Sequence, residues 1–335
     1  MTLPMRTILE AATATLAMVA GVLWAGNAVA AEPAVPPAQL CIYYGWPSYV
    51  NGSGGDAVRA AAQFMRCDLV VLGDGIEHPA HGDYASAASI VATLRQAGKE
   101  VFGYIDLGVT TQNLPSAHME RYVDEWRSMG ASGIFLDDAG YDYGVSRARQ
   151  DEVIEYVHGQ GMSVFINAWN IDDALADVDE TGHPSPSRLG PGDIYLAESW
   201  LVAGGAYQSI LDWAQKADRA LQYMRAKQVR VAGVSTAALN KAVASNIGSS
   251  KFKMGFWGAA MYNLSAWQWT DVGYSSGNDR LPFYDTASWT YGTSFHNESI
   301  AHTSGARRNE RATESGRIVV RGNGTSTGTG EFIPY

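Results

Sequence analysis

Short apolar runs alternate with amphipathic segments from residue 40 to about residue 270. Runs rich in β-branched and aromatic residues predict eight strands, at 40–45, 68–73, 100–107, 133–138, 163–168, 193–198, 229–234 and 264–269. Segments with apolar residues three and four positions apart predict helices at 56–65, 86–96, 116–129, 146–158 and 207–227. Eight strands that alternate with helices predict an α/β fold, a single-domain (β/α)8 TIM barrel. The alternative is an open, doubly wound parallel sheet.

The two ends of the chain differ from this pattern. Arg6 precedes an apolar run over 11–25 and an A-x-A sequence at 28–30, which is typical of a secretory signal peptide over 1–30. A membrane anchor is the alternative. We expect cleavage, and therefore a secreted or periplasmic protein with a linker over 31–39 and the barrel domain over 40–296.

The composition after residue 273 becomes rich in glycine, serine, threonine and asparagine. Such a segment lacks the apolar positions that a packed core requires. We therefore expect a flexible or partly ordered, irregular C-terminal extension over 297–335. A small terminal hairpin around 317–321 is the alternative.

Charge and cysteine content narrow the class of protein. The net charge of −10 makes nucleic acid and anionic membranes poor partners and leaves a neutral or cationic polymer unhindered. No later segment is long and apolar enough to cross a bilayer, so we expect no membrane contact after signal cleavage. Cys41 and Cys67 are the two cysteines of the chain, each at the start of a predicted strand. A disulfide between them is expected in an exported protein, and two buried thiols are the alternative.

Polar and aromatic residues gather where the predicted strands end. Active sites of α/β barrels lie at the carboxyl ends of the strands, so these residues are candidates for binding. Aromatic rings cover the apolar faces of sugars, and amides and carboxylates bind sugar hydroxyls. The expected substrate-binding residues are Tyr44, Trp46, Asp74, Tyr104, Asp106, Asn167, Trp169, Trp200, Trp267, Gln268 and Trp269.

Carboxylates at the ends of the fourth and sixth predicted strands are the candidate catalytic groups. Asp137 and Asp138 follow one apolar run, and Glu198 follows the other. Glycoside hydrolysis needs two carboxyl groups on either side of the scissile bond. Strand alternation implies that Asp137 and Asp138 point in different directions, so that only one of them reacts. The sequence leaves open which one.

The sequence lacks the motifs of several other classes of enzyme. The chain has no G-x-S-x-G elbow, no H-E-x-x-H pair and no phosphate-binding glycine loop, so we expect no cofactor and no metal. We therefore predict a glycoside hydrolase that cleaves a polysaccharide. Two alternatives to this function stay open. One is a non-catalytic carbohydrate-binding barrel, and the other is a metal-dependent lyase or hydrolase that uses Asp74, His78 and His81.

Four segments resemble those of the glycoside hydrolase family 114 barrels and, more loosely, the spherulin-4-like hydrolases of family 135. They are 43–46 (Tyr-Tyr-Gly-Trp), 103–106 (Gly-Tyr-Ile-Asp), 133–137 (Gly-Ile-Phe-Leu-Asp) and 165–167 (Phe-Ile-Asn), and the resemblance covers residues 40–270. It implies endo-acting hydrolysis of α-1,4-linked galactosamine or N-acetylgalactosamine polymers.

The same resemblance implies a role for each acid. It makes Asp137 the nucleophile and Glu198 the general acid/base. In spherulin-4-like chains a Glu follows the acid of the fourth strand, whereas this chain has the shorter Asp138.

Overall fold

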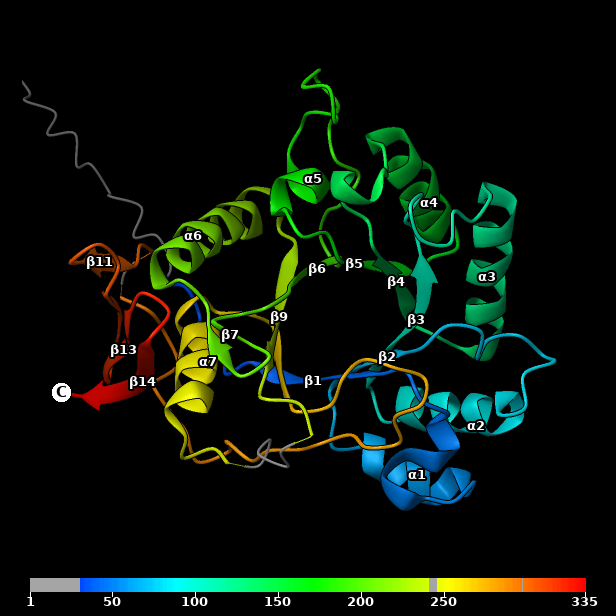
Figure 1. The fold of residues 1–335 in the computed structure, drawn as a ribbon, viewed down its shortest axis with the longest axis horizontal. Coiled ribbons are helices and arrows are strands. Elements are labelled where there is room, and N and C mark those ends of the chain that lie inside the picture. The colour runs from blue at the N-terminus through cyan, green and yellow to red at the C-terminus, as the bar shows by residue number, and fades with distance from the viewer. Residues whose placement is uncertain (1–30, 241–245, 297) are drawn as a thin grey trace, which may run out of the picture. The chain divides into compact units, whose positions relative to one another are not determined.

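The computed structural model describes residues 31–240, 246–296 and 298–335, so the predicted signal peptide lies outside the described residues. Eight parallel strands close into a barrel in the order β1-β10-β9-β6-β5-β4-β3-β2 (Figure 1). Their bounds are β1 Ala38–Tyr43, β2 Leu69–Leu72, β3 Glu100–Asp106, β4 Gly133–Asp137, β5 Ser163–Ile166, β6 Ile194–Ala197, β9 Arg230–Thr236 and β10 Ala266–Thr270. The closed order confirms the predicted barrel and excludes the open sheet.

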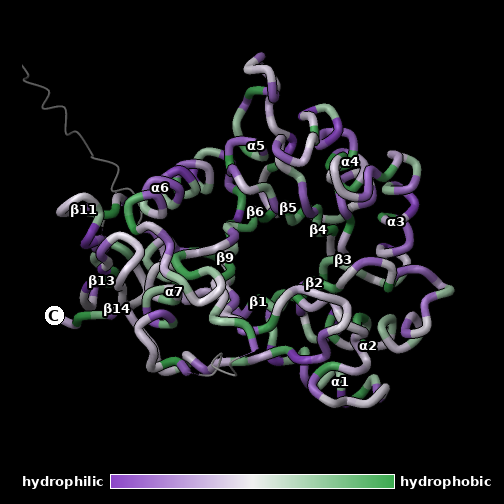
Figure 2. Tube along the Cα trace, in the orientation of Figure 1, coloured by the Kyte–Doolittle hydropathy of each residue, from purple (hydrophilic) through white to green (hydrophobic). Residues whose placement is uncertain are grey.

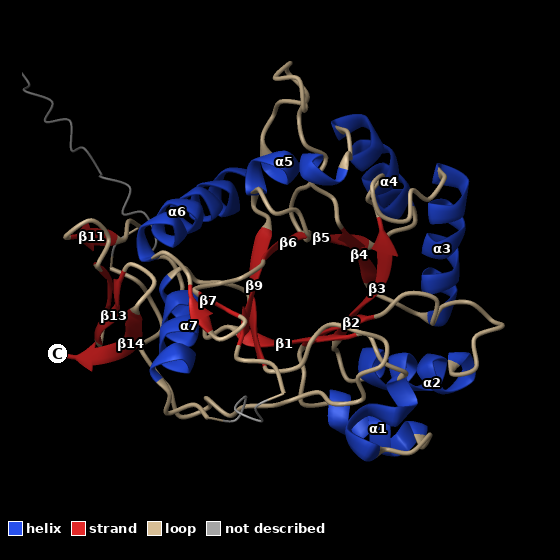
Figure 3. Ribbon diagram, viewed as in Figure 1, coloured by secondary structure: helices blue, strands red, loops and turns tan. Residues whose placement is uncertain are grey.

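Helices surround the barrel (Figure 3), and each lies in the chain between two strands. They are α1 Ala57–Phe64, α2 Tyr84–Gln96, α3 Ser116–Met129, α4 Arg147–Gly159, α5 Ile171–Leu175, α6 Ile210–Lys227 and α7 Ser250–Met261. Side chains that accept backbone N–H groups begin several of them, for example Asp56 at α1 and Ser146 at α4. In the described part of the chain no helix follows β10.

The structure also contains two short helices and two short strands. They are the 3-10 helices η1 Pro47–Gly52 and η2 Tyr141–Tyr143, and the paired strands β7 Val202–Ala203 and β8 Ala206–Tyr207. None of the described helices is both long and apolar enough to cross a bilayer.

The core has two layers, one inside the barrel and one between strands and helices. Phe102, Phe135 and Phe165 fill the interior in edge-to-face contact, with ring centroids 5.0–5.6 Å apart. In the outer layer the ring of Trp126 from α3 lies directly against Gly103, where a Cβ would stand 2.0 Å from the indole. Figure 2 shows hydrophobic residues concentrated along the barrel strands.

Cys41 and Cys67 form a disulfide that joins β1 to the start of β2. The bond spans 26 residues of chain. The alternative of two free thiols is therefore excluded. In the chain-entropy model, a loop of this length stabilises the fold by about 3 kcal/mol.

The C-terminal extension forms a four-stranded antiparallel sheet instead of an irregular segment. Its strands are β11 Ala301–Thr303, β12 Arg308–Thr313, β13 Gly316–Asn323 and β14 Thr327–Pro334. The sheet packs on α7, where the ring of Phe332 stacks on Trp257. The buried positions of β12 are polar, namely Asn309, Arg311 and Thr313, so hydrophobic alternation does not reveal this strand. The hairpin alternative around 317–321 comes closer to the structure, because these residues belong to β13.

The expected linker over 31–39 is also ordered in its described residues. Pro33 pairs with Ser294 as an isolated bridge, and β1 begins at Ala38. Glu32 forms ion pairs with Arg225 at 2.8 Å and with Arg311 at 2.6 Å. These partners lie far away in the sequence, so no local pattern predicts the contacts.

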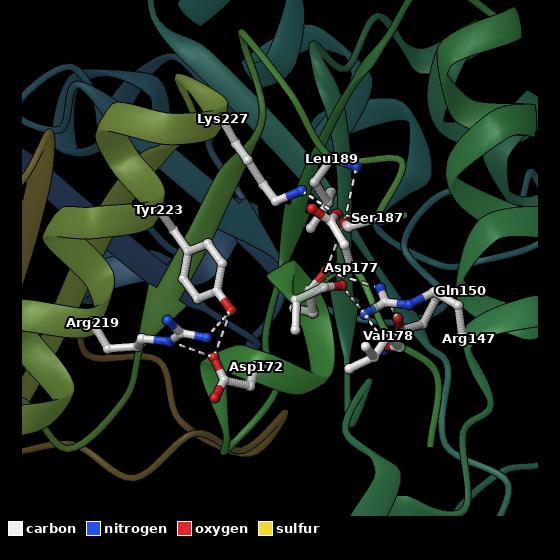
Figure 4. A network of polar contacts seen from close by, with 12 residues as sticks. Arg147, Gln150, Asp172, Asp177, Val178, Ser187, Leu189, Arg219, Tyr223 and Lys227 are labelled. Atoms are coloured by element: carbon white, nitrogen blue, oxygen red, sulfur yellow. Dashed lines mark hydrogen bonds and ion pairs between the residues drawn. The ribbon is translucent and has the colours of Figure 1, made fainter. Parts of the chain in front are cut away.

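The long loop between α5 and β6 is fixed by a polar network (Figure 4). The buried guanidinium of Arg147 donates to the carbonyl of Ala174 in α5 at 3.0 Å and to that of Ala176, at the start of this loop, at 2.9 Å. It also donates to Gln150, whose amide in turn donates to the carbonyl of Ala139. Ala139 is the second residue after β4, so the network connects this loop to the end of β4.

Candidate active site

Two of the predicted catalytic carboxylates meet at the carboxyl ends of β4 and β6. Asp137 is the last residue of β4, and Glu198 directly follows β6. Asn167 directly follows β5, the strand between them. Its Nδ2 donates to Asp137 Oδ1 at 2.8 Å and reaches Glu198 Oε2 at 3.4 Å. Because both oxygens contact one nitrogen, they are at most about 6 Å apart, a limit that includes the ~5–5.5 Å separation of retaining glycosidases and falls below the upper range of inverting ones.

The two acids have different surroundings. Asp137 is largely withdrawn from water, and this burial raises its pKa, helped by the charge of Glu198. Hydrogen bonds from Asn167, from the backbone N–H of Asp138 and from the Tyr104 hydroxyl oppose the rise without cancelling it. Glu198 is exposed. One carboxylate is therefore held in place by several donors, and the other is open to solvent.

Asp138 also lies at the site, as the first residue after β4. Burial raises its pKa to about 6, with further contributions from the charges of Asp137 and Asp106. Its backbone is left-handed, with φ of 50°, and so is that of Ser199, with φ of 57°. Each candidate acid of the pair is thus followed by a non-glycine residue in a conformation that L-residues rarely adopt.

A cavity of about 670 Å³ occupies the mouth of the barrel around these acids. It is lined by Ile42, Tyr44, Asp74, Tyr104, Gln112, Phe135, Asp137, Asp138, Tyr143, Asn167, Leu196, Glu198, Val234, Tyr274, Ser275 and Ser276. A smaller cavity of about 120 Å³ adds Asp142 and Trp169. Five carboxylates but no lysine, arginine or histidine are among the described residues that line these two cavities.

A third cavity of about 500 Å³ lies beside the mouth, between the end of β6 and α6. It shares Glu198 and Trp169 with the smaller cavity. Trp169 is 52 % exposed, and the ammonium of Lys216 lies 4.3 Å from its ring centroid. Glu198 therefore lines all three cavities, and the exposed indole of Trp169 lines two of them.

Several predicted binding residues line the mouth, and others do not. Tyr44, Asp74, Tyr104 and Asn167 face the large cavity. Trp46 is exposed but packs against Tyr49 and His81, away from the three cavities.

Asp106, which was predicted to bind substrate, hydrogen-bonds within its own loop. Its Oδ1 accepts hydrogen bonds from the Gly108 N–H and the Thr111 hydroxyl, at 2.7 and 2.6 Å. The side chain is buried and belongs to none of the three cavity linings. Asp106 therefore anchors the loop after β3.

The tryptophans of β10 are likewise core residues. Trp267 and Trp269 point out of the barrel and pack against Phe252 of α7. The ring centroid of Phe252 lies 5.2 Å from that of Trp267 and 5.7 Å from that of Trp269. Gln268, between them, points inward, where it hydrogen-bonds to the backbone of Ile42. Trp200 borders the third cavity, but its ring is buried against Trp213 and Tyr262.

The mouth is also lined by Gln112, Tyr143 and Tyr274, which the sequence pattern did not predict. Gln112 donates to Asp74 Oδ2 at 3.1 Å, and Tyr143 hydrogen-bonds to Asp138. Tyr274 donates to Gln268 Oε1 at 3.1 Å and packs against Tyr44. Tyr274 lies four residues after β10, so the rule that strand ends carry the site could have found it. Gln112 lies in the loop between β3 and α3, and Tyr143 ends the short helix η2, so neither is near enough to a strand end to give such a signal.

The structure does not assemble the proposed metal ligands Asp74, His78 and His81. His78 contacts Glu125 of α3 instead. The imidazole of His81 lies against Trp46, with ring centroids 5.0 Å apart.

No model of a known protein family matches the chain, and no curated protein matches it. Similar solved structures include the glycoside hydrolase domain of PelA from Pseudomonas aeruginosa, with 12 % identity and a TM-score of 0.41, covering 73 % of this chain and 100 % of that chain. An Anoxybacillus α-amylase has 11 % identity and a TM-score of 0.49, covering 86 % and 87 %. Haloferax volcanii malate synthase has 12 % identity and a TM-score of 0.44, covering 72 % and 67 %. These proteins catalyse different reactions, so the likeness concerns the barrel alone.

Proposed function

We propose that the protein is a glycoside hydrolase that cleaves a polysaccharide with Asp137 and Glu198 as its catalytic pair. The observation that carries the proposal is the Asn167 amide, which contacts both carboxylates at the barrel mouth. Glycoside hydrolysis with retention needs two carboxyl groups at about this separation. No cofactor is needed for this reaction.

The division of labour follows from the two environments. Asp137 is held by Asn167, Tyr104 and the Asp138 backbone, which suits a nucleophile whose oxygen must meet the anomeric carbon in line. Glu198 is exposed and can exchange protons with water, which suits a group that protonates the leaving oxygen and then deprotonates the incoming water. Attack by Asp137 forms a glycosyl ester as the glycosidic bond breaks, and water then releases the sugar and restores the carboxylate.

The charge of the mouth supports a polymer of amino sugars. Five carboxylates without a basic partner in the two linings attract cations, and a partly deacetylated α-1,4-linked galactosamine polymer carries ammonium groups. This substrate agrees with the family resemblance of the sequence. Glu198 lines three cavities, which supports endo cleavage, since sugar units on either side of the scissile bond need room.

We also propose that the protein is exported. The signal-peptide pattern over 1–30 and the Cys41–Cys67 disulfide support an oxidising location, secreted or periplasmic. N-terminal sequencing of the protein recovered from the culture medium or periplasm should give a chain that begins near residue 31. Recovery of the uncleaved chain from the cytoplasm would contradict export.

Product analysis tests the hydrolase. The wild type, Glu198→Gln and the surface control Glu155→Gln are incubated with galactosamine polymers, their N-acetylated forms and neutral glycans. We expect oligosaccharides from amino-sugar polymers with the wild type and the control, and none with Glu198→Gln. Binding without cleavage by every variant would instead identify a carbohydrate-binding barrel.

Azide rescue tests the roles of the two acids. In a retaining α-glycosidase, azide replaces the missing nucleophile of Asp137→Ala and gives a β-glycosyl azide. In Glu198→Ala it attacks the glycosyl enzyme and gives an α-glycosyl azide. The reverse pattern of products would exchange the two roles.

A further inference from the structure

A second cluster of ionisable side chains lies outside the barrel mouth. Glu77 and His78 belong to the loop between β2 and α2, and Glu125 belongs to α3. One potential ligand atom from each of these residues lies within 4.8 Å of the other two. None of the three lines the cavities of the mouth. The proposed hydrolysis therefore does not use them.

Glu77 is the unusual member of the cluster. Its side chain is 0 % exposed, and no described side chain donates a hydrogen bond to either carboxylate oxygen. The backbone N–H groups of Glu77 itself and of Gly75 lie near the carboxylate, but they oppose the rise of its pKa only in part. Asp74 and Glu125 add negative charge to its surroundings. An isolated buried carboxylate is unfavourable unless it takes up a proton or binds a cation. Burial raises the pKa of Glu77 to about 8, so a protonated acid is the alternative to a bound cation.

His78 lies between the two glutamates. Its Nδ1 contacts Glu125 Oε2 at hydrogen-bond distance, and its Nε2 lies 3.8 Å from Glu77 Oε1. That gap is too long for a hydrogen bond, but two ligands of one metal ion, each about 2.1 Å from it, lie about 3–4 Å apart. An imidazole whose other nitrogen is fixed by a carboxylate is a common metal ligand.

Besides Asp74, the cationic side chain of Arg121 faces the cluster. Its Nε lies 4.0 Å from Glu125 Oε1, the oxygen that does not contact His78. The Tyr122 ring packs on His78, with ring centroids 4.7 Å apart. Arg121 thus partly balances Glu125, but it forms no ion pair with Glu77.

We propose that Glu77, His78 and Glu125 form a binding site for one divalent transition-metal ion. Glu77 and His78 Nε2 are direct ligands, and Glu125 either orients the imidazole or becomes the third ligand. One imidazole and two carboxylates without a thiolate select ions such as Zn²⁺ and Mn²⁺. The ion ties the β2–α2 loop to α3. Because Asp74 lies three residues before Glu77 in this loop, the ion also fixes one wall of the barrel mouth.

Calorimetric titration of the chelator-treated chain with ZnCl2 and with MnCl2 tests the site. We expect one ion per chain, with micromolar or tighter affinity. Zn²⁺ at 100 times Kd should raise Tm by about 4 °C. Glu77→Gln and His78→Gln should each weaken binding at least tenfold, whereas the surface variants His183→Gln and Glu120→Gln should bind like the wild type. Glu77→Gln keeps the shape of the side chain, so it should fold.

Cobalt provides a readout that does not depend on affinity. Co²⁺ bound to the wild type should show ligand-field absorption bands that are missing in His78→Gln. If the wild type binds neither metal, or if Glu77→Gln and His78→Gln bind as tightly as the wild type, the proposal is wrong and Glu77 is a buried neutral acid. All of these measurements are independent of polymer cleavage, so failure of the hydrolase proposal would leave them interpretable.

Discussion

The barrel mouth and the C-terminal sheet both withdraw ionisable side chains from water, but they compensate the charge differently. Under the sheet, the buried guanidinium of Arg311 binds Glu32 at 2.6 Å and the carbonyl of Met261 at 2.9 Å, and it covers the ring of Phe295. At the mouth, Asp137 has neutral donors and acidic neighbours, and no cation lines the described walls of the cavity.

This difference separates charge that serves the fold from charge that serves a ligand. A buried ion pair keeps its partners together, and removing one partner leaves the other uncompensated. Clustered acids without cations destabilise the folded state, and such groups concentrate at functional sites. Substitutions in the sheet should therefore affect stability, and substitutions at the mouth should affect activity.

The largest expected effect follows from replacing the buried acid of the mouth. Asp137→Asn should lower kcat at least about 10³-fold, because an amide cannot attack the anomeric carbon. Its Tm should equal or exceed that of the wild type, since the repulsion between Asp137 and Glu198 is lost. Polymer cleavage and thermal unfolding are measured beside the α3 control Asp124→Asn. A variant that keeps a tenth of the activity would remove Asp137 from the catalytic pair.

A substitution in the C-terminal sheet should lower stability and leave activity unchanged. Arg311→Met should lower the free energy of unfolding by about 2–3 kcal/mol, because it removes the buried ion pair with Glu32 and the hydrogen bond to the Met261 carbonyl, while Arg225 still pairs with Glu32. Below its Tm the variant should cleave polymer as the wild type does. The exposed control Arg317→Met should cost less than about 1 kcal/mol. Adding Glu32→Gln to Arg311→Met should recover part of the loss, and strictly additive losses in urea unfolding would mean that the two residues do not interact.

The exposed indole beside Glu198 gives a smaller effect. Trp169→Ala should raise KM about tenfold with little change in kcat, since an aromatic platform binds substrate and transition state alike. Trp46→Ala, which alters an exposed tryptophan outside the cavities, is the matched control. Equal KM values for the two variants would exclude Trp169 from polymer binding.

The smallest expected effect is a pH dependence near the pKa of Asp138. Below about pH 6 this acid is neutral and no longer attracts an ammonium group, so kcat/KM should rise several-fold as pH increases through 6. Stability should change in the other direction. Between the ordinary pKa of an aspartic acid and 6 the folded chain keeps a proton that the unfolded chain has lost, so this contribution to stability falls as pH rises. Asp138→Asn should flatten both profiles, and an unchanged activity profile would show that another group titrates.

The barrel was predictable because its strands are continuous apolar runs that end in polar residues. Asp137 and Glu198 could be found from that rule alone. Their common contact with Asn167 could not, since it depends on the spacing of three strands in space. The direction of the β10 side chains could not be predicted either, because Trp267 and Gln268 suit either face of a strand.

The C-terminal sheet shows a different limit. Hydrophobic alternation identifies strands whose buried face is apolar, but β12 buries Asn309, Arg311 and Thr313. These residues are stabilised by partners such as Glu32, which lies 279 residues away from Arg311 in the sequence. A polar strand of this kind becomes visible only when its distant partners are known.

Asp138 follows Asp137 and Ser199 follows Glu198, and both have a left-handed backbone. This conformation affects which substitutions a selection for thermal stability would favour. Each conformation costs roughly 1 kcal/mol for a residue with a Cβ, and less for glycine or asparagine. A screen for heat resistance alone would therefore reward glycine or asparagine at these positions. Because glycine and asparagine adopt the left-handed conformation readily, the recovered variants should keep the backbone turns after Asp137 and Glu198 and unfold at a higher temperature.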